Sequence, residues 1–270
     1  MPAPYALNHI TVPYADFAEL ASFARGQGMR AVEIRNDLDG VPLSDGTPAH
    51  ALRAQADEAG VAILSINALR RFDLWNPARE DEAVSLARYA REAGAGALVL
   101  CPVNDRDDRR PQPERAADLR RALQALAGIL TDHGIGGLVE PLGFVQCALR
   151  RKRDALDAID ATANGACFSL LHDTFHHVLS GETELFPART GLVHISGVED
   201  DDIPVGRMLD LHRVLVGPRD RLDNVGQIRA LRHGGYAGPL SFEVFASSVH
   251  DDPDPIAALA GSVAYLDASS

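Results

Sequence analysis

The chain has 270 residues, of which 46% are hydrophobic and 24% are charged. This length accommodates one large α/β domain, and we expect a single domain over residues 1–270. The formal net charge of −12 argues against a nucleic-acid partner, because a phosphate backbone is bound by clustered Lys and Arg. No apolar run approaches the roughly 18 residues of a membrane span, and the first ten residues lack the pattern of a secretory signal. We therefore expect a cytoplasmic protein that binds neither nucleic acid nor membranes.

The cysteine and lysine positions exclude several chemistries. Cys101, Cys147 and Cys167 lie far apart, and no CxxC pair occurs, so neither a disulfide framework nor a thiolate zinc site is expected. The single lysine, Lys152, belongs to the basic run 150–153. We expect this run to begin a helix and to form a solvated face. Schiff-base chemistry then has no nucleophile.

Short apolar runs alternate with longer amphipathic segments along the chain, as in parallel βα units. The predicted strands lie at 6–12, 31–35, 61–67, 97–102, 137–141, 167–173, 191–196 and 240–245. Helices are predicted between the first five strands, at 16–28, 48–60, 78–94 and 114–134. Most of these segments end in Gly, which is common at helix C-termini. Eight such units predict an α/β fold, a single (β/α)8 TIM barrel.

The connection between the seventh and eighth strands is longer than the others. Residues 197–221, after the seventh strand, form a polar stretch that contains three Gly and two Pro. Because long loops on the C-terminal face of a barrel commonly cover a site, we expect a lid or a binding wall. The acidic run 199–202 is expected to be mostly solvated charge.

Acidic and histidine side chains stand at the ends of the last four predicted strands. They are Glu140, Asp173, His194 and Glu243. A single strand-end carboxylate is often a helix cap or an ion-pair partner, but four consecutive strands share the feature, and buried carboxylates need a cation or donors to compensate them. The set predicts one divalent metal ion, Mn²⁺, Mg²⁺, Co²⁺ or Zn²⁺, with positions left for substrate oxygens.

The chain resembles the xylose-isomerase-like superfamily of TIM barrels, the sugar phosphate isomerase/epimerase type, over nearly its whole length. The resemblance rests on VEIR at 32–35, GFVQC at 143–147, DTFHH at 173–177, EDDDIPVG at 199–206 and DLHRV at 210–214. Within the superfamily it is most similar to the inosose isomerases (2-keto-myo-inositol isomerases) of inositol catabolism.

The resemblance implies that the four strand-end residues are the metal ligands and that Glu140 and Glu243 also act as acid/base groups. His176 matches a histidine that contacts substrate oxygen, and Arg213 matches an arginine that reaches the substrate or a neighbouring carboxylate. For His177 we expect a packing role. Three more residues end the second and third strands and are expected to line the pocket: Arg35, Asn67 and Arg70.

The expected reaction moves a carbonyl on a sugar or cyclitol ketone. The cation polarises the carbonyl, one glutamate removes a proton from the neighbouring carbon, and the same or the other glutamate returns it. Hydride transfer stays open as a variant. The oligomeric state is also left open, and a homo-oligomer is one alternative.

Three alternatives are weighed against this function. A dehydratase of the same superfamily, acting on inosose or 3-dehydroshikimate, would begin with the same proton abstraction. A nuclease similar to endonuclease IV would use Asp210 and His212 as further ligands, but it also needs histidines at the ends of the second and third strands, where Arg35 and Asn67 stand. A non-catalytic barrel would leave the four strand-end residues without a role.

Overall fold

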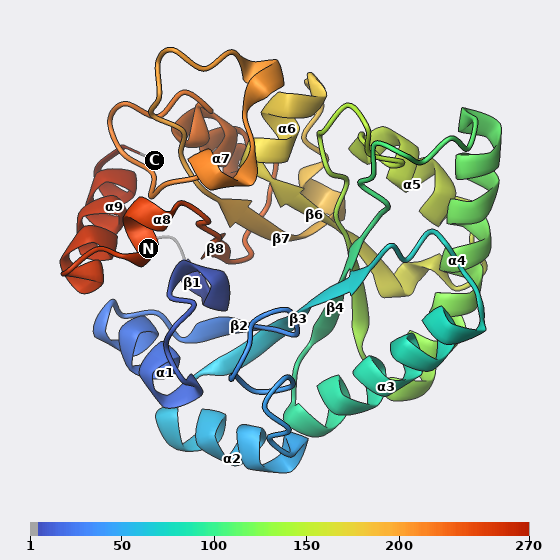
Figure 1. The fold of residues 1–270 in the computed structure, drawn as a ribbon, viewed down its shortest axis with the longest axis horizontal. Coiled ribbons are helices and arrows are strands. Elements are labelled where there is room, and N and C mark those ends of the chain that lie inside the picture. The colour runs from blue at the N-terminus through green and yellow to red at the C-terminus, as the bar shows by residue number, and fades with distance from the viewer. Residues whose placement is uncertain (1–4, 270) are drawn as a thin grey trace.

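The computed structural model describes residues 5–269, and these residues form a closed barrel of eight parallel strands in the order β1 to β8 (Figure 1). Pairing of β1 with β8 closes the barrel. The strands are β1 (Tyr5–Asn8), β2 (Ala31–Arg35), β3 (Ala62–Arg70), β4 (Ala97–Cys101), β5 (Gly136–Val139), β6 (Phe168–Asp173), β7 (Thr190–Ile195) and β8 (Leu240–Phe242). The predicted (β/α)8 TIM barrel is confirmed. Residues 1–4 and 270 of the predicted domain lie outside the described residues.

Helices follow the strands and surround the barrel (Figure 1). They are α1 (Phe17–Gly26), α2 (Ala49–Ala59), α3 (Pro77–Ala93), α4 (Gln112–His133), α5 (Lys152–Asp160), α6 (Thr174–Ser180), α7 (Asn224–His233), α8 (Ser247–His250) and α9 (Pro255–Ser269). Gly94 and Gly134 end α3 and α4 with φ of 79° and 66°, a left-handed conformation that glycine adopts without steric cost. None of the helices within residues 5–269 is long and apolar enough to cross a membrane.

The first strand is shorter than predicted. It ends at Asn8, whose side-chain oxygen accepts a hydrogen bond from the Ile10 N–H at 3.2 Å. This contact begins a short 3-10 helix over His9–Thr11, because an Asn side chain that binds nearby backbone competes with the strand ladder.

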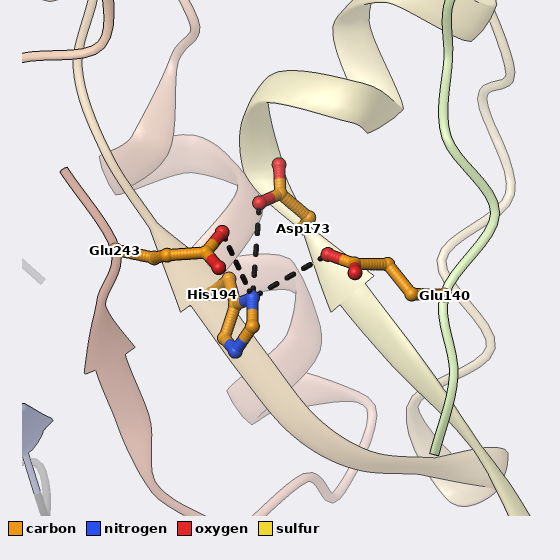
Figure 2. Close-up of side chains that lie close together, drawn as sticks. All are labelled: Glu140, Asp173, His194 and Glu243. Carbon is orange, nitrogen blue, oxygen red and sulfur yellow. Dashed lines mark ion pairs between the residues drawn. The ribbon is translucent and has the colours of Figure 1, made fainter. Parts of the chain in front are cut away.

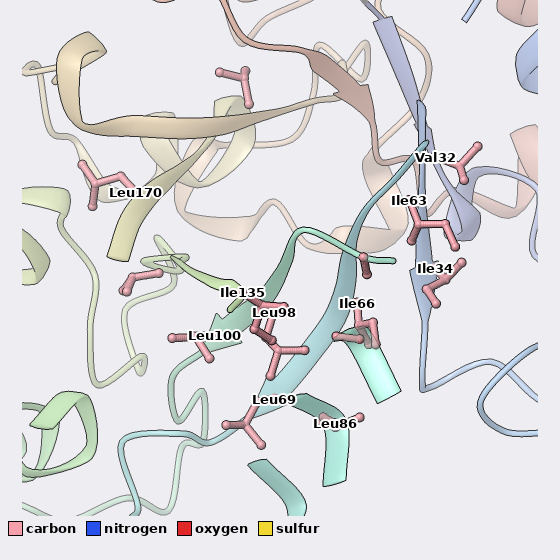
Figure 3. Packing of buried hydrophobic residues seen from close by; sticks show 14 of the residues in the cluster. Val32, Ile34, Ile63, Ile66, Leu69, Leu86, Leu98, Leu100, Ile135 and Leu170 are labelled. Carbon is pink, nitrogen blue, oxygen red and sulfur yellow. The ribbon is translucent and has the colours of Figure 1, made fainter. Parts of the chain in front are cut away.

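Alternation along the strands separates two environments. In β2, Val32 and Ile34 pack outward among the helices (Figure 3), so Glu33 and Arg35 point into the barrel. In β4, Leu98 belongs to the same outer core and Val99 to the inner one.

The barrel interior is apolar on one half and polar on the other. Its apolar half is built from Ala68, Ala97, Val99, Leu138, Leu171 and Leu192, mostly on β4 to β7. On the other half, fully buried polar side chains come from β1, β2, β3, β7 and β8: Asn8, Glu33, Ser65, His194 and Ser241. Polar groups so deep in a protein need partners in the same layer.

The long connection after β7 is folded rather than extended. Gly197 and Val214 exchange backbone hydrogen bonds of 2.7 and 2.8 Å, and 3-10 turns form at Val205–Arg207 and Asp210–His212. Residues 200–202 are exposed, as predicted. The fold of this loop returns Arg213 to the barrel mouth.

The basic run 150–153 is a solvated face only in part, and that prediction was wrong for Lys152. Arg151 and Arg153 are exposed, but Lys152 is buried as the first residue of α5. Its Nζ lies 2.7 Å from His177 Nδ1 and 3.3 Å from Glu182 Oε2. Burial outweighs the charge of Glu182 and lowers the pKa of Lys152 from 10.5 to about 8.

We expect the folding stability of the wild type, relative to a Lys152→Met variant, to rise with pH between about 8 and 10.5. In this window the unfolded lysine is protonated and the folded one is mostly neutral, so unfolding takes up a proton. Urea unfolding of both proteins across the window measures the difference. A difference that stays constant with pH would contradict the expectation.

We expect Leu98→Ala, in the fully buried outer core, to lower the free energy of unfolding by about 2–5 kcal/mol. The cost comes from lost apolar burial and the cavity that is left. Val145→Ala is the matched control, because Val145 is 76% exposed and should change stability by less than about 0.5 kcal/mol. Denaturant titrations of the wild type and both variants measure the free energies of unfolding. These values can be compared if the dependence on denaturant concentration is the same in all three proteins.

Candidate metal centre

The four strand-end residues converge at the mouth of the barrel. Glu140 follows β5, Asp173 ends β6, His194 lies in β7 and Glu243 follows β8. Each contributes one ligand-type atom to a group in which all these atoms lie within 4.8 Å of one another, and all four residues are buried (Figure 2).

His194 is at the centre of this group. Its Nδ1 lies 3.2 Å from Glu243 Oε2, 3.4 Å from Glu140 Oε1 and 4.0 Å from Asp173 Oδ2. Among the described residues this buried nitrogen has no hydrogen-bond partner. An unpartnered imidazole nitrogen that faces three carboxylates is a donor set that suits a divalent cation.

The charge around His194 also fits a cation. Four carboxylates are buried here, Glu33 and the three acidic members of the group, whereas Arg35 and Arg213 are the buried guanidiniums in contact with them. The carboxylates therefore exceed the guanidiniums by two negative charges, which a divalent ion would balance.

The titration behaviour follows from the same charges. Burial by itself would lower the pKa of His194, but the negative charges of Glu243 and Glu33 outweigh it and hold that pKa well above its usual range. Burial would raise the pKa of Glu243, but His194 and Arg213 outweigh it and hold that pKa well below its usual range. A proton on His194 and a cation at its Nδ1 are thus alternative ways to compensate the carboxylates.

The other nitrogen of the imidazole, Nε2, contacts Glu33, which was not among the predicted site residues. His194 Nε2 lies 3.0 Å from Glu33 Oε1 and 3.2 Å from Oε2. The sequence of β2 could have identified Glu33, because this acidic residue lies between the apolar residues Val32 and Ile34 and therefore points to the opposite side of the strand.

Glu243 and Glu140 are held differently. Glu243 accepts hydrogen bonds from Arg35 Nη1 at 2.9 Å, Asn67 Nδ2 at 3.2 Å and Arg213 Nη2 at 2.9 Å. Glu140 accepts one from the Cys101 thiol at 3.2 Å. Glu243 is therefore fixed from three sides, and Glu140 has the greater freedom.

Asp173 has two further roles. Its Oδ1 accepts the His176 N–H at 2.8 Å and so caps the N-terminus of α6. Its Oδ2 accepts Arg213 Nη2 at 2.6 Å. Arg213 reaches both Asp173 and Glu243 from the folded loop after β7, as the sequence predicted for a neighbouring carboxylate.

A cavity of about 360 Å³ opens over the group, and Glu140 and Glu243 line it. The five residues predicted to bind substrate all line it as well: Arg35, Asn67, Arg70, His176 and Arg213. His177 lies outside this lining and contacts Lys152. Lining residues that the prediction did not name include Cys101, Asn104, Leu142, Phe144 and Phe245.

A further acidic residue, which the prediction did not name, contacts two of the arginines that line the cavity. Asp37 accepts hydrogen bonds from Arg35 Nε and Nη2, both at 2.8 Å, and also pairs with Arg70. Arg35 is thereby held between Asp37 and Glu243. Asp37 follows the VEIR strand by two residues, and nothing in that spacing marks it as an arginine partner.

A closed (β/α)8 barrel with this acidic and histidine group at the carboxyl ends of its strands defines the class of the protein. The model of the xylose isomerase-like TIM barrel family matches residues 21–268, and the chain belongs to this family. A xylose isomerase domain-containing protein from Salmonella typhimurium is 30% identical with a TM-score of 0.85, over 99% of this chain and 96% of that one.

Two other solved structures share the fold at lower identity. The IolI protein, whose structure contains a bound zinc atom, is 18% identical with a TM-score of 0.88, over 99% of each chain. D-psicose 3-epimerase from Clostridium cellulolyticum, solved with D-tagatose, is 13% identical with a TM-score of 0.78, over 98% of this chain and 99% of that one. No curated protein matches the chain significantly.

Proposed function

We propose that the protein is a divalent-metal-dependent isomerase or epimerase that moves a carbonyl on a sugar or a keto-inositol. The observation that carries the proposal is the convergence of four ligand-type atoms within 4.8 Å beneath a cavity that two of the same residues line. The isomerase and epimerase names among structures of the same fold, and the zinc in the IolI structure, support it.

The ligands in this proposal are Glu140, Asp173, His194 and Glu243, and their oxygen and nitrogen donors suit Mn²⁺, Mg²⁺, Co²⁺ or Zn²⁺. When bound, such an ion supplies Lewis-acid polarisation of a substrate carbonyl. The two glutamates of the set act in proton transfer. One takes a proton from the carbon next to the carbonyl, and the same or the other group returns it to the adjacent carbon.

The contacts of the two glutamates favour an unequal division of this work. Three donors hold Glu243, and the charges of His194 and Arg213 favour its ionised form. Glu140 has one thiol donor, and both side chains line the cavity. Glu140 is therefore better placed to take up and release a proton, and Glu243 to remain a carboxylate that orients the substrate.

The cavity offers two kinds of surface to a polyhydroxylated ring or chain. Arg35, Asn67, Arg70, His176 and Arg213 present hydrogen-bond donors for hydroxyl and carbonyl oxygens. Leu142, Phe144 and Phe245 present an apolar wall for C–H groups. 2-Keto-myo-inositol is the first candidate substrate, because the sequence resemblance to inosose isomerases includes Arg35, His176 and Arg213 of this cavity.

The geometry gives less support to a nuclease. Arg35, at the end of β2, and Asn67, within β3, contact Glu243 in the places where the histidines of an endonuclease IV-like cluster were expected. Asp210 pairs with Arg213 at 3.3 Å, and the half-buried His212 contacts the Leu209 backbone. Within residues 5–269, neither Asp210 nor His212 joins the group of four.

We expect the purified protein to bind one divalent ion per chain. Removal of the ion by a chelator should abolish turnover, and Mn²⁺ added back should restore it. Asp173→Asn should weaken binding by at least an order of magnitude, because it removes one charged donor. Calorimetric titration measures the number of ions bound per chain and the dissociation constant. Asp118→Asn, a buried aspartate that pairs with Arg110, is the control. Wild-type protein without stoichiometric binding would refute the metal centre.

We expect a screen of ketoses and keto-inositols with added Mn²⁺ to show migration of the carbonyl, or inversion at the adjacent carbon, without loss of water. Glu140→Gln and Glu243→Gln should each lower kcat by about 10²–10⁴-fold, whereas Glu114→Gln, on an exposed face of α4, should leave it unchanged. NMR of the products makes the assignment. An unsaturated product would identify a dehydratase instead.

A further inference from the structure

Glu33 occupies an unusual position in the barrel interior. It is fully buried on β2 and receives hydrogen bonds from four other strands. The donors are Asn8 Nδ2 at 3.3 Å, Ser65 Oγ at 2.6 Å, His194 Nε2 at 3.0 Å and Ser241 Oγ. Its carboxylate is therefore fixed in place from β1, β3, β7 and β8.

Fold stability alone does not explain this carboxylate. Among residues 5–269 no arginine or lysine forms an ion pair with Glu33, and His194 is its one ionisable partner. An isolated buried carboxylate is costly, and uncharged residues of similar volume commonly serve a protein interior better. A charged residue in the interior, where an uncharged one would be more stable, is expected at positions that function requires.

The geometry at His194 indicates what the function is. Both oxygens of Glu33 lie within 3.2 Å of Nε2, so this nitrogen carries the hydrogen and the ring cannot turn freely. When His194 is neutral, as a metal ligand must be, the other nitrogen, Nδ1, is left with its lone pair toward Glu140, Asp173 and Glu243. In metal sites, the partner of the second ring nitrogen sets the tautomer and the orientation of a ligating histidine.

We propose that Glu33 is a positioning residue of the metal centre, which holds His194 in the tautomer and orientation that present Nδ1 to the ion. The proposal rests on the metal centre proposed above. Glu33 does not line the cavity, so its effect on the substrate is indirect, through residues such as His194 that it contacts.

The test compares Co²⁺ and Mn²⁺ binding by wild type and Glu33→Gln, with calorimetry for affinity and the visible absorption of bound Co²⁺ for geometry. We expect unchanged stoichiometry, a dissociation constant weakened by about 10–100-fold and an altered Co²⁺ spectrum. The melting temperature of the metal-free variant is measured beside these, to establish that the compared protein is folded.

Asp73→Asn is the matched control. Asp73 is also buried and hydrogen-bonded, but its partners are the Val103 N–H at 2.7 Å and Arg110. Its replacement should leave the affinity and spectrum of Co²⁺ unchanged. Equal metal affinity in wild type and Glu33→Gln, with or without a lower melting temperature, would overturn the positioning role. A wild type that binds no ion would instead refute the metal centre itself.

A second variant covers the case in which Glu33→Gln does not fold. Ser65→Ala removes the 2.6 Å donor and leaves the carboxylate in place. We expect a smaller loss of Co²⁺ affinity in the same direction, with a change in the Co²⁺ spectrum, because Glu33 is then held less firmly against His194. Affinity and spectrum identical to those of the wild type would overturn the proposal.

Discussion

The structure depends on how four buried carboxylates are kept together around one imidazole. Each of Glu33, Glu140, Asp173 and Glu243 would be costly to bury alone, and His194 contacts or faces all of them. A closed barrel makes this crowding unavoidable, because every second residue of each strand points to the same narrow interior. The remaining polar residues of the mouth can be understood as partners of these charges.

The two buried arginines illustrate this. Arg213 contacts Asp173 and Glu243 from the loop after β7, and Arg35 contacts Glu243 from β2. Both guanidiniums lie over the ring of Phe245, with 4.7 Å and 5.5 Å from the guanidinium carbon to the ring centroid. The ring that both contact helps to stabilise two like charges at the same carboxylate without adding another ion.

Much of this arrangement could be predicted from the sequence. The alternation of short apolar strands and amphipathic helices predicted the barrel, and the carboxyl ends of parallel strands must meet, so the four strand-end residues could be expected in one place. Glu33 was missed because attention to strand ends passes over a residue in the middle of a strand. Its importance depends on Ser65, His194 and Ser241, which are distant in the chain.

The buried state of Lys152 was missed for a related reason. A run of four basic residues has the composition of a solvated surface, and only the tertiary fold places one member, Lys152, against His177 and Glu182. The pairing of Asp37 with Arg35 could not be predicted either, because the sequence does not determine the direction of a side chain in a loop. Local patterns determine elements and faces, whereas these pairs are determined by how the loops fold over the mouth.

The cap of α6 joins ligand geometry to pocket shape. Asp173 holds the first turn of that helix through the His176 N–H, and the His176 ring packs edge-on against Phe144, 5.2 Å between centroids, in the cavity wall. A displacement of the Asp173 carboxylate is thus transmitted through one hydrogen bond to an aromatic contact that shapes the cavity. In the proposed function, the position of this ligand and the shape of the cavity are therefore connected through the first turn of α6.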